Sequence, residues 1–351
     1  MTQEKPKVTK RYVLFLLIGL SIFILYLYLS RTNIPKMITI IQSTDPFYYS
    51  LAVIAFLLNI LCYSLAWQYF LRPLSVNVSF RKTFMFTWVG AFIDILIPAE
   101  SVSGEISKAY FMSKETGGKT GKVIASIVSH RIISMIITIS SLILSSLSFF
   151  VLKYELPSFI LNWIIFVAVG TAVTLFFLFL FSVKEKWAQK IIDLTLRFFE
   201  FISRGHWHLA GLRSKAQKTL KTFHQAIEVL GTHPRSLAQP VAFSIASWFF
   251  SILIPFLVFF SLLGHPIHLG VVIIVHSVSW AVRLIPFGIP AEIGLTESFM
   301  AFLYGTLLGV PPHVSSAGAI LISALTVGLK LIVGFVALQW VGIKPQVGSS
   351  R

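Results

Sequence analysis

Residues 88–117 read WVGAFIDILIPAESVSGEISKAYFMSKETG, and residues 280–309 read WAVRLIPFGIPAEIGLTESFMAFLYGTLLG. The two stretches align without a gap at an offset of 192 residues, and nine of the thirty positions are identical. The shared positions include a Trp, a Pro and two Glu, residue types that apolar bias alone does not align. We interpret the two stretches as corresponding parts of an internal repeat.

The composition of the chain is that of a membrane protein. Of its 351 residues 56% are hydrophobic and only 12% are charged, whereas soluble domains are roughly a quarter charged. The formal net charge is +16, which fits basic cytoplasmic loops that set orientation and meet anionic headgroups. No nucleic-acid-binding motif accompanies this charge, so nucleic acid is not an expected partner.

The hydrophobic runs predict the spans. A membrane-crossing helix needs about 20 mostly apolar residues, and six runs qualify: 12–29, 47–71, 123–152, 158–183, 237–263 and 313–341. The apolar stretches 83–97 and 269–289 differ, because each ends at a proline and leads into a polar-studded segment, 98–113 and 290–308. We predict an all-α polytopic membrane protein, a single integral membrane domain over 1–351, with about six full spans plus two hairpins.

Basic residues fix the predicted orientation. Residues 184–236 hold ten Lys and Arg, whereas 264–268 hold none. The positive-inside rule then places both termini in the cytoplasm of a multi-pass protein of the cell (plasma or inner) membrane. Each hairpin must return to its own side. Full helical pairs also satisfy this requirement, but interruptions of backbone hydrogen bonding favour re-entrant or broken helices, at Pro98, Pro286 and Pro290.

This orientation makes the repeat an inverted one. Repeat one covers about 47–152 and repeat two about 237–341, and the first hairpin enters from the cytoplasm while the second enters from outside. Inverted repeats with broken helices are typical of transporters, whose substrate site lies at the repeat interface near the midplane. The loop 184–236 is cytoplasmic and basic. It is predicted to hold an interfacial amphipathic helix, whose apolar stripe is Trp187, Ile191, Leu194, Phe198 and Phe201.

Ionisable residues gather in the two hairpins, although a charge at membrane depth is costly. The candidate substrate-binding residues are Asp94, Glu100, Glu105 and Lys108 in the first hairpin, Arg131 near the start of the next span, and Arg283, Glu292 and Glu297 in the second. The cations are expected to bind phosphate, and the glutamates to shape the cavity or hold protons. The alternative is internal ion pairing that only fixes the hairpins. Lys330 and His276 are interpreted as structural.

Catalytic patterns are missing from the sequence. There is no HExxH, GxSxG or P-loop motif, and the single cysteine, Cys62, lies inside an apolar run. No metal and no cofactor are expected, and the chain is not expected to be an enzyme.

The motifs resemble a known family. The segment 98–117, the His130-Arg131 pair and the segment 283–309, followed by Val310, look like the transmembrane flippase domain of lysylphosphatidylglycerol synthases. More closely, the chain resembles stand-alone bacterial and archaeal membrane proteins built from that domain alone. The resemblance implies helices with two re-entrant hairpins and movement of a lipid between leaflets.

The resemblance also assigns motif positions. It maps the family motifs onto Pro98, Gly104, Glu105, Lys108, Arg131, Pro286, Pro290, Gly294 and Glu297. Three departures are visible: Ser103-Gly104 replaces paired glycines, Lys108 replaces Arg, and 289–292 replaces a proline with adjoining glycines. The aminoacyl-transferase domain is absent, so the chain is not expected to synthesise lysyl-lipid.

The sequence therefore supports one main hypothesis and two alternatives. The hypothesis is a flippase that moves an anionic phospholipid or a polyprenyl-phosphate-linked lipid between leaflets. The first alternative is a partner or scaffold for a separate lipid glycosyltransferase or synthase, docked through the basic loop. The second is a membrane enzyme that modifies a lipid headgroup, for which the sequence supplies no nucleophile or metal cluster.

Overall fold

The computed structural model describes residues 10–97, 102–151, 157–202, 210–282 and 289–342, and throughout these ranges the regular structure is helical. Five helices there are long and apolar enough to cross a membrane, with a sixth if a bent pair near the N-terminus counts as one span. The predicted all-helical polytopic fold is confirmed. The helices that occupy the predicted spans are α1 (Lys10–Leu29), α3 (Pro46–Leu71), α6 (Thr120–Val151), α7 (Ser158–Val183), α10 (Ala238–Leu263) and α13 (Pro312–Gly342).

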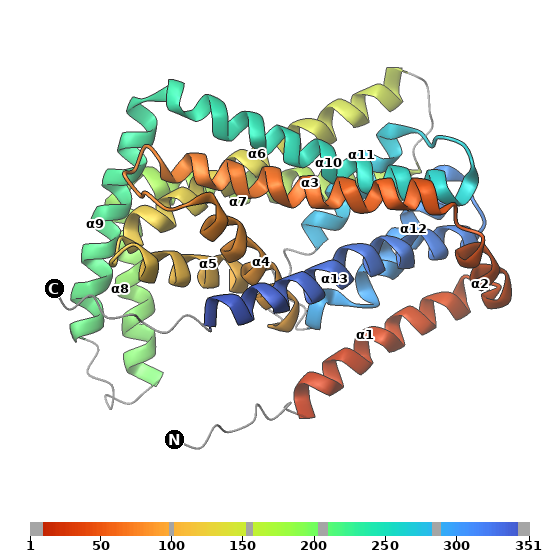
Figure 1. Ribbon diagram of the computed structural model, residues 1–351, viewed down its shortest axis with the longest axis horizontal. Coiled ribbons are helices and arrows are strands. Elements are labelled where there is room, and N and C mark those ends of the chain that lie inside the picture. Colours follow the sequence, from red (N-terminus) through yellow and green to blue (C-terminus); the bar gives the residue numbers. More distant parts are fainter. Residues whose placement is uncertain (1–9, 98–101, 152–156, 203–209, 283–288, 343–351) are drawn as a thin grey trace.

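Helix α2 (Ile34–Gln42) is an element that the hydrophobic runs did not predict. It follows α1 at an angle of 106°. Asn33 caps its start by accepting a 3.0 Å hydrogen bond from the Lys36 amide, and Pro35 occupies the first turn, where a missing N–H costs nothing. The chain therefore turns sharply before α3 begins (Figure 1).

The two predicted hairpins are pairs of short helices. The first pair is α4 (Phe80–Leu96) and α5 (Val102–Glu115), and the second is α11 (Leu269–Val282) and α12 (Leu295–Leu308), with the 3-10 turn η2 (Pro290–Glu292) between them. At 1.5 Å per residue these helices are only ~21–26 Å long, which is shorter than a bilayer core of ~30 Å. Broken helices, not additional full spans, occupy these positions. Pro98 and Pro286 lie outside the described residues.

The repeat extends far beyond the thirty aligned positions. Helix α3 covers 46–71 and α10 covers 238–263, so both ends are separated by the same 192 residues. Helices α6 and α13 begin at 120 and 312, again 192 residues apart. The packing follows the same exchange, because α4 packs on α13 as α11 packs on α6, and α5 packs on α6 as α12 packs on α13.

Corresponding helices of the two repeats run in opposite directions. Helices α3 and α10 lie side by side (Figure 1). The Asp45 amide donates to the Ser261 carbonyl at 3.0 Å, the Asn59 amide donates to the Ser247 carbonyl at 2.7 Å, and the Tyr69 ring stacks on Phe243 at 5.3 Å. Residue numbers that rise along one helix fall along the other, so the pair is antiparallel and the repeat is inverted.

Each hairpin begins and ends at one end of the bundle (Figure 1). In the first hairpin, Lys82 at the start of α4 forms an ion pair with Glu115 at the end of α5. At the opposite end, Ser145 near the end of α6 donates a 2.9 Å hydrogen bond to the Gly270 carbonyl at the start of α11. The distribution of basic residues along the sequence predicted that each hairpin returns to its own side.

Helices α8 (Glu185–Ile202) and α9 (Ala210–Thr232) cross one end of the bundle, and the 3-10 turn η1 (Pro234–Leu237) leads into α10 (Figure 1). Trp187, Ile191 and Leu194 of the predicted apolar stripe are exposed on α8. Such a stripe suits burial in the headgroup region of a leaflet. The side chains of Phe198 and Phe201 lie outside the described part of the structure.

Candidate functional site: a polar cavity between the repeats

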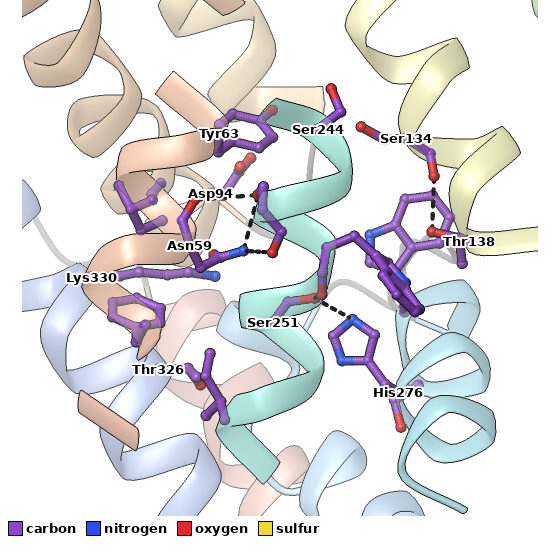
Figure 2. A pocket seen from close by; sticks show the side chains of 18 of the residues that line it. Asn59, Tyr63, Asp94, Ser134, Thr138, Ser244, Ser251, His276, Thr326 and Lys330 are labelled. Atoms are coloured by element: carbon purple, nitrogen blue, oxygen red, sulfur yellow. Dashed lines mark hydrogen bonds between the residues drawn. The ribbon is translucent and has the colours of Figure 1, made fainter. Parts of the chain in front are cut away.

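A cavity of about 360 Å³ lies between the two repeats, and all eight of their helices contribute to its wall: α3, α4, α5, α6, α10, α11, α12 and α13. Figure 2 shows polar side chains from both repeats directed into this space, among them Asn59, Ser251, His276 and Lys330. A polar cavity among apolar helices is where a bundle places a ligand.

The wall of the cavity follows the symmetry of the repeat. Eight pairs of lining residues are separated by 192 positions. Examples are Phe56 and Trp248, Asn59 and Ser251, Thr87 and Ser279, Ser134 and Thr326, and Thr138 and Lys330. None of these eight pairs is identical in residue type, yet their positions match. The cavity therefore lies where the repeats face one another.

Lys108 of α5 is the most deeply placed cation described in the cavity wall, with 6% of its surface exposed. Its Nζ donates a 3.0 Å hydrogen bond to the Tyr63 hydroxyl, and it lies 4.9 Å from the centre of the Tyr63 ring and 5.4 Å from that of Trp67. Gly90 of α4 makes room for it, because a Cβ there would stand 2.8 Å from Lys108 Cγ. Aromatic faces stabilise a cation in a desolvated position.

Arg131 of α6 connects the two repeats. Its Nη1 lies 3.1 Å from Glu105 Oε1, and both side chains are partly exposed. Its guanidinium also lies 5.2 Å from the centre of the Trp280 ring on α11. A planar guanidinium suits this combination of carboxylate pairing and stacking, which a lysine does not reproduce.

Asp94 lines the cavity and holds the first hairpin together. Its Oδ1 accepts hydrogen bonds from Ser103 Oγ at 2.8 Å and from the Gly104 amide at 2.6 Å. These donors belong to the first turn of α5, where free amides and the helix dipole favour a carboxylate. Asp94 therefore ties the end of α4 to the start of α5.

The glutamates of the second hairpin do not belong to the cavity wall. Glu297 is buried, and its Oε2 accepts a 2.6 Å hydrogen bond from the Gly294 amide, so it caps α12. Glu292 is buried beside Thr296, whose Oγ1 donates to Glu292 Oε2 at 3.4 Å. Neither residue is among those that line the cavity. For Glu297 the described contact corresponds to the alternative interpretation, in which the charge fixes its own hairpin.

The remaining predicted site residues, Glu100 and Arg283, lie outside the described residues. Of the eight candidates, the structure thus brings Asp94, Glu105, Lys108 and Arg131 to one cavity.

Sequence reasoning also assigned two cavity residues to a structural role. Lys330 of α13 and His276 of α11 both line the cavity, and His276 Nε2 lies 3.3 Å from Ser251 Oγ. The internal repeat indicates that Lys330 belongs to the cavity wall, because it is the counterpart of Thr138 at the offset of 192. This correspondence is visible only when the repeat is extended from the hairpins to the long helices.

Charge breaks the symmetry of the cavity. Lys108 corresponds to Met300, Arg131 to Ser323, and Lys330 to Thr138. The described wall carries three cations against the carboxylates of Asp94 and Glu105, so it favours an anionic ligand. Within the part of the chain that the structure describes, no group of three or more His, Cys, Asp or Glu residues could hold a metal ion.

Fold and site together define a multi-pass membrane protein with inverted repeats around one polar, cationic cavity. Comparison with known proteins gives the family. The chain belongs to the family described as the lysylphosphatidylglycerol synthase TM region, whose model matches residues 14–334.

The relatives are archaeal membrane proteins. A UPF0104 membrane protein of Pyrococcus horikoshii is 26% identical over 298 residues, which cover 84% of this chain and 87% of that protein. A UPF0104 membrane protein of Methanocaldococcus jannaschii is 24% identical over 341 residues, 95% of this chain and 96% of that one. One of Methanothermobacter thermautotrophicus is 23% identical over 303 residues, 86% and 88% of the two chains. No solved structure matches the chain.

Proposed function

We propose that the protein is a lipid translocator that moves an anionic phospholipid or a polyprenyl-phosphate-linked lipid between the leaflets of the cell membrane. The single observation that carries this proposal is the polar, cationic cavity lined by both inverted repeats.

The cavity is placed near the middle of the membrane-spanning helices. Asn59 and Ser251 stand near the middle of α3 and α10, two helices long enough to span the membrane, and both line the cavity. A charged side chain in such a position costs at least ~2.5 kcal/mol on insertion scales. Lys108, Arg131 and Lys330 therefore mark a place where an anion is expected.

The volume of the cavity suits a lipid headgroup. A volume of about 360 Å³ is near the lower end of ligand pockets, which span roughly 300–1,000 Å³. It accommodates a phosphate headgroup but not the acyl or prenyl chains, which then remain in the bilayer. A lipid that keeps its tail in the membrane while its headgroup crosses a polar space is what a flippase transports.

The symmetry of the inverted repeats suits alternating access to the cavity. Because the repeats are inverted, an exchange of conformation between them would open the same cavity first to one side and then to the other. We expect the basic end of the bundle, with α8 and α9, to face the cytoplasm. The protein would then transport its lipid without changing it chemically, and would need no cofactor.

Leaflet exchange tests the proposal. The purified chain is placed in phosphatidylcholine vesicles that carry a trace of fluorescent phosphatidylglycerol or fluorescent polyprenyl phosphate, and outer-leaflet quenching reports exchange. The Lys108→Met variant copies the residue that the second repeat has at the equivalent position, Met300. Losing a charge-assisted contact of about 1.5–3 kcal/mol should slow exchange ten- to hundredfold.

The matched comparison is Lys190→Met on the exposed face of α8, which should exchange lipid at the wild-type rate. If Lys108→Met does not fold, Arg131→Ser provides the same test, since Ser323 is the counterpart of Arg131. Absence of exchange by the wild type with both probes would contradict the proposal and favour a scaffold for a separate enzyme. An unimpaired Lys108→Met variant would contradict the site.

A further inference from the structure

The hydroxyl groups of the cavity are mostly committed as donors. Six lining residues donate their only hydroxyl hydrogen to a main-chain carbonyl, at 2.6–3.2 Å. They are Thr87, Thr138, Ser244, Ser247, Ser251 and Thr326. A carbonyl oxygen only accepts, so the hydrogen must come from the hydroxyl. What such a side chain retains for a ligand is its lone pairs.

Asn59 is committed in the same way. Its Nδ2 donates to the Ser247 carbonyl at 2.7 Å and to Ser247 Oγ at 3.0 Å, which uses both of its amide hydrogens. Only its carbonyl oxygen remains to contact a ligand, and that oxygen accepts. These seven side chains therefore present hydrogen-bond acceptors to a ligand, alongside the three cations of the described wall.

An acceptor-rich wall requires a ligand with donors. A phosphate oxygen only accepts when ionised, so it pairs with Lys108 or Arg131 but not with the hydroxyl lone pairs. Burying those lone pairs against further acceptors would leave them without partners, which is unfavourable. A bare phosphate thus matches the cations and mismatches these seven side chains.

The donors of the ligand can be hydroxyl or ammonium groups, and the charges decide between them. A buried ammonium group is best stabilised by a carboxylate that has lone pairs to spare. The cavity carboxylates already accept other bonds: Asp94 from Ser103 and Gly104, and Glu105 from Arg131. Since cations also outnumber carboxylates in the described wall, neutral hydroxyl donors fit better.

Three further lining residues carry buried polar atoms. Ser279 Oγ, His130 Nε2 and Trp248 Nε1 are buried and have no hydrogen-bond partner among the described residues. The indole N–H can only donate, and the serine hydroxyl can donate or accept. Each of these three atoms exposes less than 1 Å², so they lie behind the accessible wall, and the acceptors named above define its contact with a ligand.

We infer that the headgroup taken by this cavity carries several hydroxyl groups, as a polyol or glycosyl phosphate does. The inference rests on the proposed function and narrows its substrate class. It divides the cavity into a cationic part for the phosphate, with Lys108 and Arg131, and an acceptor part for the hydroxyls, with residues such as Thr138 and Ser244.

Binding of soluble headgroups tests the inference without requiring transport. The probes are inositol 1-phosphate, glycerol 1-phosphate, phosphoethanolamine and inorganic phosphate. They are titrated against the purified full chain while tryptophan fluorescence is recorded, because Trp248 and Trp280 line the cavity. Inositol phosphate should bind at least about tenfold more tightly than inorganic phosphate, since two or more net hydrogen bonds are gained. Phosphoethanolamine should bind no better than phosphate.

Two substitutions identify the acceptor wall. Thr138→Val and Ser244→Ala each remove one acceptor and should weaken inositol phosphate binding about three- to tenfold, while inorganic phosphate binds as before. The matched variant is Thr174→Val on α7. Thr174 donates to the Gly170 carbonyl at 2.8 Å, just as Thr138 donates to the Ser134 carbonyl at 2.9 Å. It is exposed and is not among the lining residues, so it should change nothing.

The outcomes separate this inference from the proposed function. Equal binding of inositol phosphate and inorganic phosphate, or tighter binding of phosphoethanolamine, overturns the inference even if the protein moves lipids. A preference for inositol phosphate that is lost in Thr138→Val supports the inference even if no lipid exchange is measured. If Thr138→Val does not fold, Ser244→Ala decides in its place.

Discussion

The close packing of the first hairpin leads to a prediction about Gly90. This residue lies on α4 where α5 crosses it. A Cβ built on Gly90 would lie 2.8 Å from Lys108 Cγ and 3.0 Å from the Gly104 carbonyl oxygen. The lysine stem can bend away, whereas the carbonyl is part of α5 and moves only with the helix. Gly90→Ala therefore forces α4 and α5 apart at the cavity wall.

The magnitude follows from two opposing terms. Replacing a glycine by alanine inside a helix stabilises it by about 0.5–1 kcal/mol, whereas overpacking a close contact costs about 1–3 kcal/mol. The substitution Gly170→Ala on α7 measures only the gain in helix stability, because a Cβ there would meet nothing within 4 Å. Gly90→Ala should thus be less stable than Gly170→Ala by the overpacking cost, about 1–3 kcal/mol.

The assay is thermal unfolding of each variant in the same detergent, followed by tryptophan fluorescence. Gly170→Ala should unfold at or above the wild-type midpoint and Gly90→Ala below it. Gly90→Ala should also slow lipid exchange, because Lys108 is displaced from Tyr63. Equal unfolding midpoints for the two variants would refute the packing of the hairpin and the placement of Lys108 that depends on it.

Three further predictions follow from other contacts. Asp94→Asn keeps the shape of the side chain but removes its charge at the start of α5. It should lower the unfolding midpoint more than Asp45→Asn, which alters an exposed cap of α3. Equal effects of the two substitutions would mean that Asp94 does not join the hairpin. Arg131→Lys keeps the charge but loses the planar group that contacts Glu105 and Trp280, so lipid exchange should fall severalfold, and an unchanged rate would refute that role. In a Cys62→Ala background, cysteines at Ser236 and His265 should react with a membrane-impermeant thiol reagent from opposite sides, with Ser236 on the cytoplasmic side; labelling of both from one side would contradict the topology.

The sequence predicted the spans and hairpins because hydrophobic runs and prolines act locally. The 192-residue offset, found from a few identities such as Trp88 and Trp280, also proved to separate the ends of the long helices. The antiparallel contact of α3 and α10 then follows from topology. What the hydrophobic runs did not predict was α2, whose start depends on a cap at Asn33.

The site was harder to predict, for two physical reasons. Single polar residues such as Asn59 and Ser244 are unremarkable within apolar helices, since a serine satisfies its own hydroxyl on the preceding turn. Identity between repeats also does not guarantee identity of role. Glu105 pairs with Arg131 at the cavity, whereas its counterpart Glu297 caps α12 at Gly294; the second repeat has Ser323 in the position of Arg131.

The proposed route of the lipid headgroup across the membrane is the cavity between the repeats. The most direct test fills that cavity and records exchange of fluorescent phosphatidylglycerol. In a Cys62→Ala background, Thr138→Cys is modified to completion with a bulky thiol reagent, and Thr174→Cys on the outside of α7 is modified in parallel. Exchange should stop in the Thr138→Cys protein and continue in the Thr174→Cys protein. Undiminished exchange with a fully modified Thr138→Cys would contradict this route.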